Sequence, residues 1–231
     1  MPIEDGAAHF LKGFSDPDAV ARYVDGPRRF VPGIDALHKM VGILLAERVP
    51  ADGRILVLGA GGGLELRALA EFSPGWRFTG VDPAAAMLDL AEQTAAAAMD
   101  RIDLIEGYID DAPQGPFDGA VCLLTLHFLA PQERQRTLAQ IHRRLRPDAP
   151  LVVAHGSYPE AGKDMWLARY AAFAAASGVE KAQAEQARAA VAASVNMLDP
   201  AQDEAIFSAA GFRDIAMFYA AFTWRGWVGY A

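Results

Sequence analysis

The sequence predicts an α/β fold with a doubly wound, mostly parallel sheet, and two observations carry this prediction. Short apolar runs alternate with helical patterns between residues 54 and 155, as expected for parallel strands joined by crossover helices. The first run breaks into glycines and resumes as a helical pattern, RILVLGAGGGLEL over 54–66, which indicates a strand, a tight turn and a helix start. Open sheets of this kind bind ligands at the carboxyl ends of their strands, so we expect the functional site there.

Each element follows from its local pattern. We expect strands over 55–58, 78–81, 102–106, 119–124 and 151–155, and helices after Leu64, from Ala84 and over 132–145. Alanine with interspersed Glu, Gln, Arg and Lys fills 164–194, and this helix-forming composition predicts two helices inserted after the fifth strand. A helix over 201–210 stops at Gly211, and two aromatic-rich strands follow, the last of them antiparallel.

Residues with almost no side chain follow the first strand: Gly59, Ala60, Gly61, Gly62 and Gly63. A ligand can therefore lie against main-chain N–H groups at the positive end of the next helix. A dinucleotide fingerprint has glycine at its first, third and sixth positions, but the sixth position here is Leu64, which disfavours NAD and FAD. We expect a different nucleotide-like cofactor.

A carboxylate marks the end of the second strand. Asp82 stands directly before Pro83 and an alanine-rich helix, and an acid at this place can accept both hydroxyl groups of a ribose. A helix cap is the alternative role, but the glycine loop and the acid fall at corresponding ends of two strands. Together they favour a nucleoside site over a purely structural turn.

The G-x-G-x-G loop followed by a strand-end acid resembles the cofactor site of class I S-adenosyl-L-methionine (SAM) methyltransferases. The resemblance implies a seven-stranded Rossmann-like sheet with an antiparallel last strand, SAM across the strand ends, and methyl transfer to a small-molecule or other acceptor. The cofactor-binding residues that it implies are Gly59, Ala60, Gly61, Asp82, Pro83, Met87, Tyr108, Ile109 and Leu123, and the narrower resemblance given below adds Arg29.

We predict a single domain over residues 1–231. Its parts are a helical lid over 1–50, a cofactor-binding core over 51–156, a helical insertion over 160–198, and a last helix with C-terminal strands over 199–231. The single cysteine, Cys122, lies in an apolar run, which favours a buried packing role and a reducing, cytoplasmic compartment. No apolar run is long enough to span a bilayer, so we expect neither a membrane anchor nor export.

Four segments also resemble the bacterial tRNA uridine-5-oxyacetate carboxymethyltransferase family, which uses carboxy-SAM: RRFVPGID at 28–35, LLTLHFLAPQERQ at 123–135, EQAR at 185–188 and AGFRDIAMFYAAF at 210–222. This resemblance implies that Arg29, or its neighbour Arg28, pairs with the carboxylate of the cofactor. It also implies that Arg188 holds the additional carboxylate of carboxy-SAM, in an arrangement that can cross a homodimer interface. A plain surface position for Arg188 is the alternative.

Two positions depart from the methyltransferase pattern. Val57 and Tyr108 stand where that family usually has acids, the first of them close to the amino end of the cofactor. Glu65 or the carbonyl group of Leu123 could contact the amine instead, and an acid that follows Tyr108 could replace the second one. The loss of two acids also leads to a third hypothesis, a SAM-binding module without catalytic activity.

Polar side chains near the ends of the fourth and fifth strands are candidates for contact with the acceptor. His127 follows the fourth strand and is the candidate catalytic base, with a structural or hydrogen-bonding role as the alternative. His155, Tyr158 and Arg188 are the candidate substrate-binding residues. The five histidines and one cysteine show no short metal-ligand spacing, so no metal site is predicted.

Charge narrows the range of partners. The chain has 21 basic and 29 acidic residues, and its formal charge of −8 gives no general attraction to polyanions. Basic residues gather on the helix predicted over 132–145, where their spacing indicates a solvated helix face. We therefore favour a small-molecule acceptor over tRNA. A homodimer through the aromatic C-terminal strands or the alanine-rich helices is an alternative to internal packing of these segments.

Overall fold

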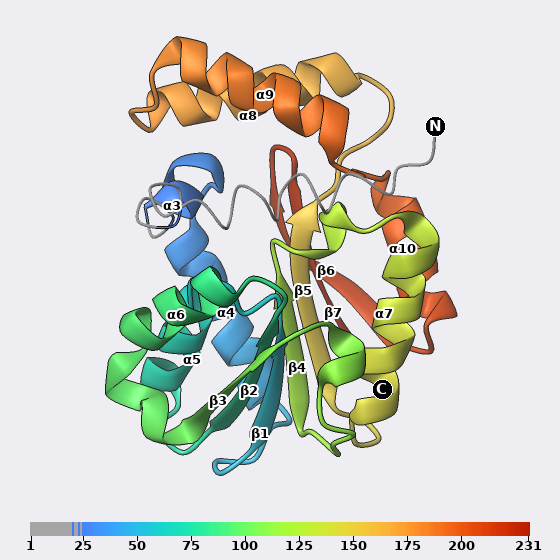
Figure 1. The fold of residues 1–231 in the computed structure, drawn as a ribbon. Coiled ribbons are helices and arrows are strands. Elements are labelled where there is room, and N and C mark those ends of the chain that lie inside the picture. Colours follow the sequence, from blue (N-terminus) through green and yellow to red (C-terminus); the bar gives the residue numbers. More distant parts are fainter. Residues whose placement is uncertain (1–19, 21–22, 24) are drawn as a thin grey trace.

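A seven-stranded sheet in the order β3-β2-β1-β4-β5-β7-β6 forms the centre of the computed structural model, which describes residues 20, 23 and 25–231 (Figure 1). The strands are β1 (Arg54–Leu58), β2 (Arg77–Asp82), β3 (Ile102–Glu106), β4 (Gly119–Leu123), β5 (Pro150–Gly156), β6 (Arg213–Ala221) and β7 (Trp224–Tyr230). Strands β1 to β5 run parallel to one another, whereas β7 is antiparallel to both β5 and β6. The predicted doubly wound sheet with an antiparallel last strand is confirmed.

Helices cover both faces of the sheet (Figure 1). They are α3 (Gly26–Phe30), α4 (Ile34–Ala46), α5 (Leu64–Phe72), α6 (Ala85–Thr94), α7 (Pro131–Arg144), α8 (Lys163–Ala176), α9 (Lys181–Ser194) and α10 (Pro200–Ala209), with short 3₁₀ turns η1 (Ala96–Arg101), η2 (Ile109–Asp111) and η3 (Leu126–Phe128). Alternate side chains of β1 enter different layers: Ile55 and Val57 pack with α4 and α5, and Leu56 packs with α7. None of the described helices combines the length and the apolar character needed to cross a bilayer.

Helix α4 is part of the layer that covers the sheet. Its side chains Leu37, Val41 and Leu45 are completely buried, and it follows Gly33, whose φ of 69° favours glycine. The segment predicted as a lid over 1–50 thus contains a core helix. Residues 1–19, 21, 22 and 24 lie outside the described part of the chain.

Helices α8 and α9 pack against each other and lie across the carboxyl ends of the parallel strands (Figure 1). We call this pair the α8–α9 cap. The two chain segments that connect it to the sheet are joined, because the carbonyl group of Leu198 accepts the N–H of Tyr158 at 3.2 Å and the hydroxyl group of Ser157 at 3.1 Å. The two helices predicted after the fifth strand are therefore confirmed, and their position places them over the expected ligand site.

The prediction of a solvated basic face on α7 is wrong for two of its arginines, whereas Arg136 and Arg143 are exposed as expected. Arg134 and Arg144 are only 1% and 2% exposed. Arg134 forms an ion pair with Asp203 of α10, and its Nε donates to the carbonyl group of Leu126 at 3.1 Å. The exposed Arg136 pairs with carboxylates, so the helix presents far less free positive charge than its composition suggests.

Candidate functional site

A cleft with a volume of about 500 Å³ lies at the carboxyl ends of β1, β2 and β4, beneath the α8–α9 cap. We call it the main cleft. Gly59, Gly61 and Asp82 line it from the sheet side, and Ala190 and Val191 line it from α9. Its size falls within the range of about 300–1,000 Å³ that is typical of small-molecule sites. The cleft therefore stands where the glycine loop predicts a ligand.

The glycine loop is held close to β2 by main-chain hydrogen bonds. The N–H groups of Gly59 and Ala60 donate to the carbonyl group of Val81 at 2.8 and 3.1 Å. Gly59 has a φ of 76°, and a Cβ atom there would overlap the side chain of Thr125. A Cβ atom at Gly61 would lie 3.0 Å from Oδ2 of Asp82, so glycine leaves open the space between the loop and the carboxylate.

Asp82 lies at the end of β2 and faces the main cleft. Its Oδ2 accepts the N–H of Gly61 and its Oδ1 accepts the N–H of Ala84, each at 3.0 Å. Burial raises the pKa of Asp82, and these two N–H donors oppose the rise. Each oxygen keeps a free lone pair for a ligand hydroxyl group, as a ribose requires. Met87 also lines the cleft, and Pro83 connects the acid to α6.

The structure does not bring the cofactor-binding candidates Tyr108 and Ile109 into the main cleft. Ile109 is 2% exposed and packs in the layer between the sheet and α7. The side chain of Tyr108 is 53% exposed, and its main-chain N–H donates to Oδ2 of Asp111 at 2.8 Å. The segment forms the 3₁₀ turn η2 after Tyr108, and sequence spacing gave no sign of that turn.

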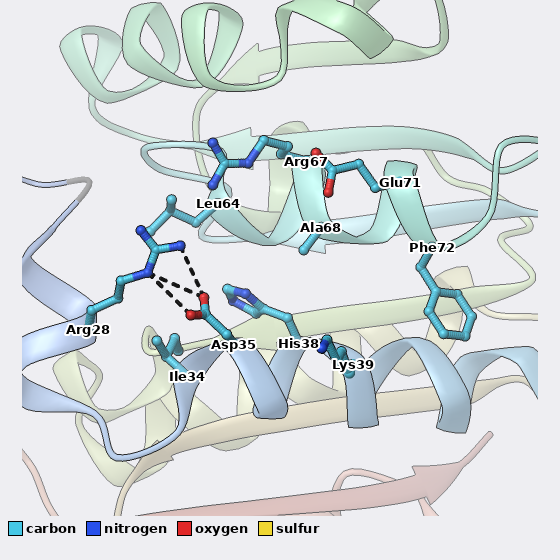
Figure 2. A pocket seen from close by; sticks show the side chains of 10 residues that line it. All are labelled: Arg28, Ile34, Asp35, His38, Lys39, Leu64, Arg67, Ala68, Glu71 and Phe72. Carbon is cyan, nitrogen blue, oxygen red and sulfur yellow. Dashed lines mark hydrogen bonds and ion pairs between the residues drawn. The ribbon is translucent and has the colours of Figure 1, made fainter.

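The arginine candidates also lie outside the main cleft, whose described lining contains neither lysine nor arginine. Arg29 is exposed at the end of α3. Arg28 pairs with Asp35 at 3.2 Å and borders a second cavity of about 200 Å³ between α4 and α5, shown in Figure 2. Arg188 pairs with Glu185 at 2.7 Å on the surface of α9. A ligand carboxylate in the main cleft thus meets no cationic side chain from the described residues.

The acceptor-site candidates His127, His155 and Tyr158 lie at different depths below the protein surface. His127 lines the main cleft and is 5% exposed. Burial, together with the neighbouring His155 and Arg134, holds the pKa of His127 well below its ordinary value. His155 is 2% exposed behind it, and burial lowers its pKa to about 3. Tyr158 is buried outside the cleft lining, so only His127 of these three can touch a ligand in the cleft.

Aromatic residues that sequence reasoning did not assign to the site complete the cleft. Trp224 at the start of β7 and Tyr170 of α8 both line it. The indole N–H of Trp224 donates to the carbonyl group of Phe30 at 2.9 Å, which joins β7 to α3 beside the cleft. The aromatic C-terminal strands were visible in the sequence, but nothing local showed that their first residue would meet the cap. Leu123, a predicted site residue, lines the cleft as expected.

Comparisons with known proteins agree with this geometry. The sequence model of the family described as "Methyltransferase domain" matches residues 55–148. The chain is 30% identical over 182 residues to the carboxy-S-adenosyl-L-methionine synthase of Chromohalobacter salexigens, covering 76% of this chain and 67% of that protein. The solved structure of PigF with SAH has a TM-score of 0.68 at 19% identity, over 95% of this chain and 61% of that chain.

Human N-acetylserotonin methyltransferase in complex with SAM has a TM-score of 0.65 at 16% identity, over 100% of this chain and 60% of that chain. The chain therefore spans less than two thirds of either solved protein, and the likeness to them concerns the fold. The matched family, the related synthase, the seven-stranded sheet and the glycine loop at the cleft lead to one assignment. The chain belongs to the family of SAM-dependent methyltransferases.

Proposed function

We propose that this protein transfers the methyl group of SAM to a small, largely apolar acceptor. The observation that carries the proposal is the lining of the main cleft, where Phe30, Val191 and Trp224 typify a mostly aliphatic and aromatic wall. An apolar wall favours a ligand that loses little hydration on entry. A charged acceptor would lose its hydration without gaining a partner of opposite sign from the described lining.

The residues of the cleft fit the cofactor. Bound SAM supplies a methyl group on a positively charged sulfonium, which is already a good leaving group, so positioning is the main task of the protein. The carboxylate of Asp82 would hold the nucleoside. The glycine loop, whose N–H groups at Gly59, Ala60 and Gly61 already donate to Val81 and Asp82, would leave room for it. Ala190 and Val191 of the cap would exclude water from the opposite side.

Carboxymethyl transfer from carboxy-SAM to tRNA is the second candidate. It is supported by the segments that resemble the carboxymethyltransferases and by the name of the related synthase, which concerns carboxy-SAM. Against it stand the formal charge of −8 and the position of Arg188, which is paired with Glu185 outside the main cleft. This candidate therefore requires Arg188 to reach the cleft of a second copy, which makes a homodimer part of it.

The discriminating experiment compares SAM, S-adenosylhomocysteine (SAH) and carboxy-SAM as ligands of the purified protein, by native mass spectrometry and by titration calorimetry. We expect SAM and SAH to bind more tightly than carboxy-SAM, with no change in Arg188→Ala. The variant Asp82→Ala should bind neither SAM nor SAH. Tighter binding of carboxy-SAM that weakens in Arg188→Ala, but not in the exposed control Arg143→Ala, would replace our proposal with the tRNA candidate.

A third candidate is a module that binds SAM without turnover. Incubation with methyl-labelled SAM and a panel of phenols, thiols and carboxylic acids tests it, because a single labelled product excludes it.

We also propose a cytoplasmic location, supported by the completely buried thiol of Cys122. Light scattering during size-exclusion chromatography then reports whether the protein is a monomer or a homodimer.

A further inference from the structure

The carboxyl group of Glu65 is buried next to the glycine loop. Glu65 stands in the first turn of α5, two residues after Gly63, and is only 8% exposed. Acids are almost never buried to this degree unless a partner compensates for the lost hydration. No ion pair to Glu65 is formed within the described part of the chain.

Glu65 borders a side cavity of about 10 Å³. This side cavity shares Tyr23, Pro27, Leu123 and Leu124 with the main cleft, so it lies at the edge of that cleft. Its volume is about that of a single water-sized probe. An ammonium group has nearly the size of a water molecule, so the side cavity can hold either of them beside the carboxyl group.

The groups that face Glu65 make the side cavity favourable for a cation. They are Asp82 from β2, the phenol of Tyr23, and the imidazole of His38 from α4, with the thiol of Cys122 further away. Burial lowers the pKa of His38 to about 4, so its ring is neutral at pH 7. Burial raises the pKa of Glu65 to about 8, its own main-chain N–H opposes the rise, and Asp82 adds to it.

We propose that Glu65 binds the α-ammonium group of the amino-acid part of the cofactor, a proposal that rests on the proposed use of SAM. SAM and SAH both carry this group, and the position of the side cavity beside the glycine loop lets the amino-acid part end there. The competing acceptor at this edge is the carbonyl group of Leu123, which already accepts the hydroxyl group of Thr125 at 2.9 Å. Asp82 is held by two main-chain N–H groups and stays with the nucleoside.

Formation of this pair has a proton balance that can be measured. The free protein carries the proton on Glu65 at pH 7, and the ligand brings an ammonium that is already charged. The carboxyl group loses its proton to solvent as the ion pair forms, so binding releases nearly one proton per site. A ligand that lacks the amino acid, such as 5′-methylthioadenosine, fills the nucleoside site without this release.

The test is titration calorimetry of SAH and of 5′-methylthioadenosine at pH 7, in two buffers with different enthalpies of ionisation. In the wild-type protein SAH should release a proton and 5′-methylthioadenosine should not. Glu65→Gln should weaken SAH binding roughly 10-fold and abolish the proton release, with the affinity for 5′-methylthioadenosine unchanged. The matched control is Glu71→Gln, an exposed acid on the same helix that borders the cavity in Figure 2.

Equal proton release with both nucleosides would overturn the proposal, because the proton would then come from a group at the nucleoside, such as Asp82. Unchanged SAH affinity in Glu65→Gln would overturn it as well and would leave the side cavity to a water molecule. If Glu65→Gln does not fold, the wild-type proton count decides alone. Failure of the wild-type protein to bind either nucleoside would overturn the proposed function too, so the two failures are distinguishable.

Discussion

The main-chain N–H of Gly156 donates a hydrogen bond to Nδ1 of His127, with 3.3 Å between the two nitrogen atoms. Because Nδ1 accepts this bond, the proton of the neutral ring lies on Nε2. The low pKa of His127 keeps the ring neutral at pH 7. A neutral ring in this tautomer donates a hydrogen bond from Nε2 and has no free lone pair there for a proton. The geometry therefore favours a hydrogen-bond donor over the catalytic base expected from sequence.

Substitution of His127 separates these two roles. We expect His127→Gln, which keeps a donor of similar reach, to retain a substantial part of methyl transfer, whereas His127→Phe should lose about 10-fold or more. Long-range ¹H–¹⁵N spectra of the wild-type protein should show Nδ1 without a proton and Nε2 with one, from pH 8 down to pH 5. Equal loss of activity in both variants, or a ring that titrates in this range, would return His127 to the role of a base.

Local patterns were sufficient to predict the sheet and the place of the main cleft beside the glycine loop and Asp82. The glycine loop and Asp82 lie next to strands in the sequence, and the sheet brings their ends together. Short spacing is enough for such features, because parallel strands always place their carboxyl ends at one edge. The two inserted helices were also predictable locally, because the alanine-rich composition of 164–194 favours helix.

The features that the sequence did not predict depend on contacts between residues far apart in the chain. The sequence around Arg134 is typical of a surface helix, but in the fold Arg134 is buried beside Asp203 of α10, which lies 69 positions later in the chain. Trp224 reaches the cleft because β7 pairs with β5 in a register that sets Trp224 opposite Gly156. The segment at Ile109 leaves the rim because its side chain gains more by packing in the core. Such preferences are decided by burial across the whole fold, which local spacing does not record.

Alanine substitutions of Gly59 in the glycine loop and of Gly178 between α8 and α9 should have different effects on stability. Gly59→Ala combines a φ of 76° with overlap against Thr125, so it should destabilise the protein by about 2 kcal/mol or more. Gly178→Ala, with a φ of 91° and free space around it, isolates the cost of the backbone alone at about 1 kcal/mol. Chemical denaturation measures both, and equal costs would contradict the overlap.

Gly61→Ala should instead affect the ligand. Its Cβ atom would lie 3.0 Å from Oδ2 of Asp82 and 3.3 Å from Cε of Met87, in the space between the loop and the carboxylate. We expect SAH affinity to fall about 10-fold or more, with a loss of stability below about 1 kcal/mol. Calorimetry and thermal unfolding test the two parts. A large loss of stability with intact SAH binding would be the contrary result.

The raised pKa of Glu65 should also appear in the pH dependence of stability. Its folded-state pKa of about 8 lies above the ordinary value of 4.5, so between these pH values the folded protein holds a proton that the unfolded chain has lost. Stability from this group is complete at low pH and falls as pH rises towards 8, by at most about 1.4 kcal/mol per pH unit.

Buried histidines act in the opposite direction at lower pH. His38 and His155, with pKa values lowered to about 4 and about 3, make the protein less stable as the pH falls below the ordinary value of 6.5. The difference between the unfolding free energies of wild type and Glu65→Gln removes their contribution. That difference should fall from pH 5 to pH 8, whereas the difference for Glu71→Gln should stay flat. A flat difference for Glu65→Gln as well would show that Glu65 is ionised in the folded protein.

The buried pair of Arg134 and Asp203 should stabilise both the fold and the position of the cap. Arg134 also donates from Nη2 to the carbonyl group of Asn196, in the segment between α9 and α10. Arg134→Met removes this bond and leaves Asp203 buried without its cation, although Oδ2 of Asp203 already lacks a hydrogen-bond partner within the described part of the chain. We expect a loss of about 3–5 kcal/mol.

The double substitution Arg134→Met with Asp203→Leu tests whether the loss comes from the unpaired charge. Removing both charges should recover much of the stability, since a buried pair often contributes little beyond an apolar replacement of similar volume. The bond to Asn196 is not recovered, so hydrogen exchange of the 195–199 segment should stay faster than in the wild type. Recovery of stability with fast exchange would show that the charge pair is replaceable while the Arg134 bond to Asn196 holds the cap over the cleft. Additive losses in the double variant would instead mean that the two side chains act independently.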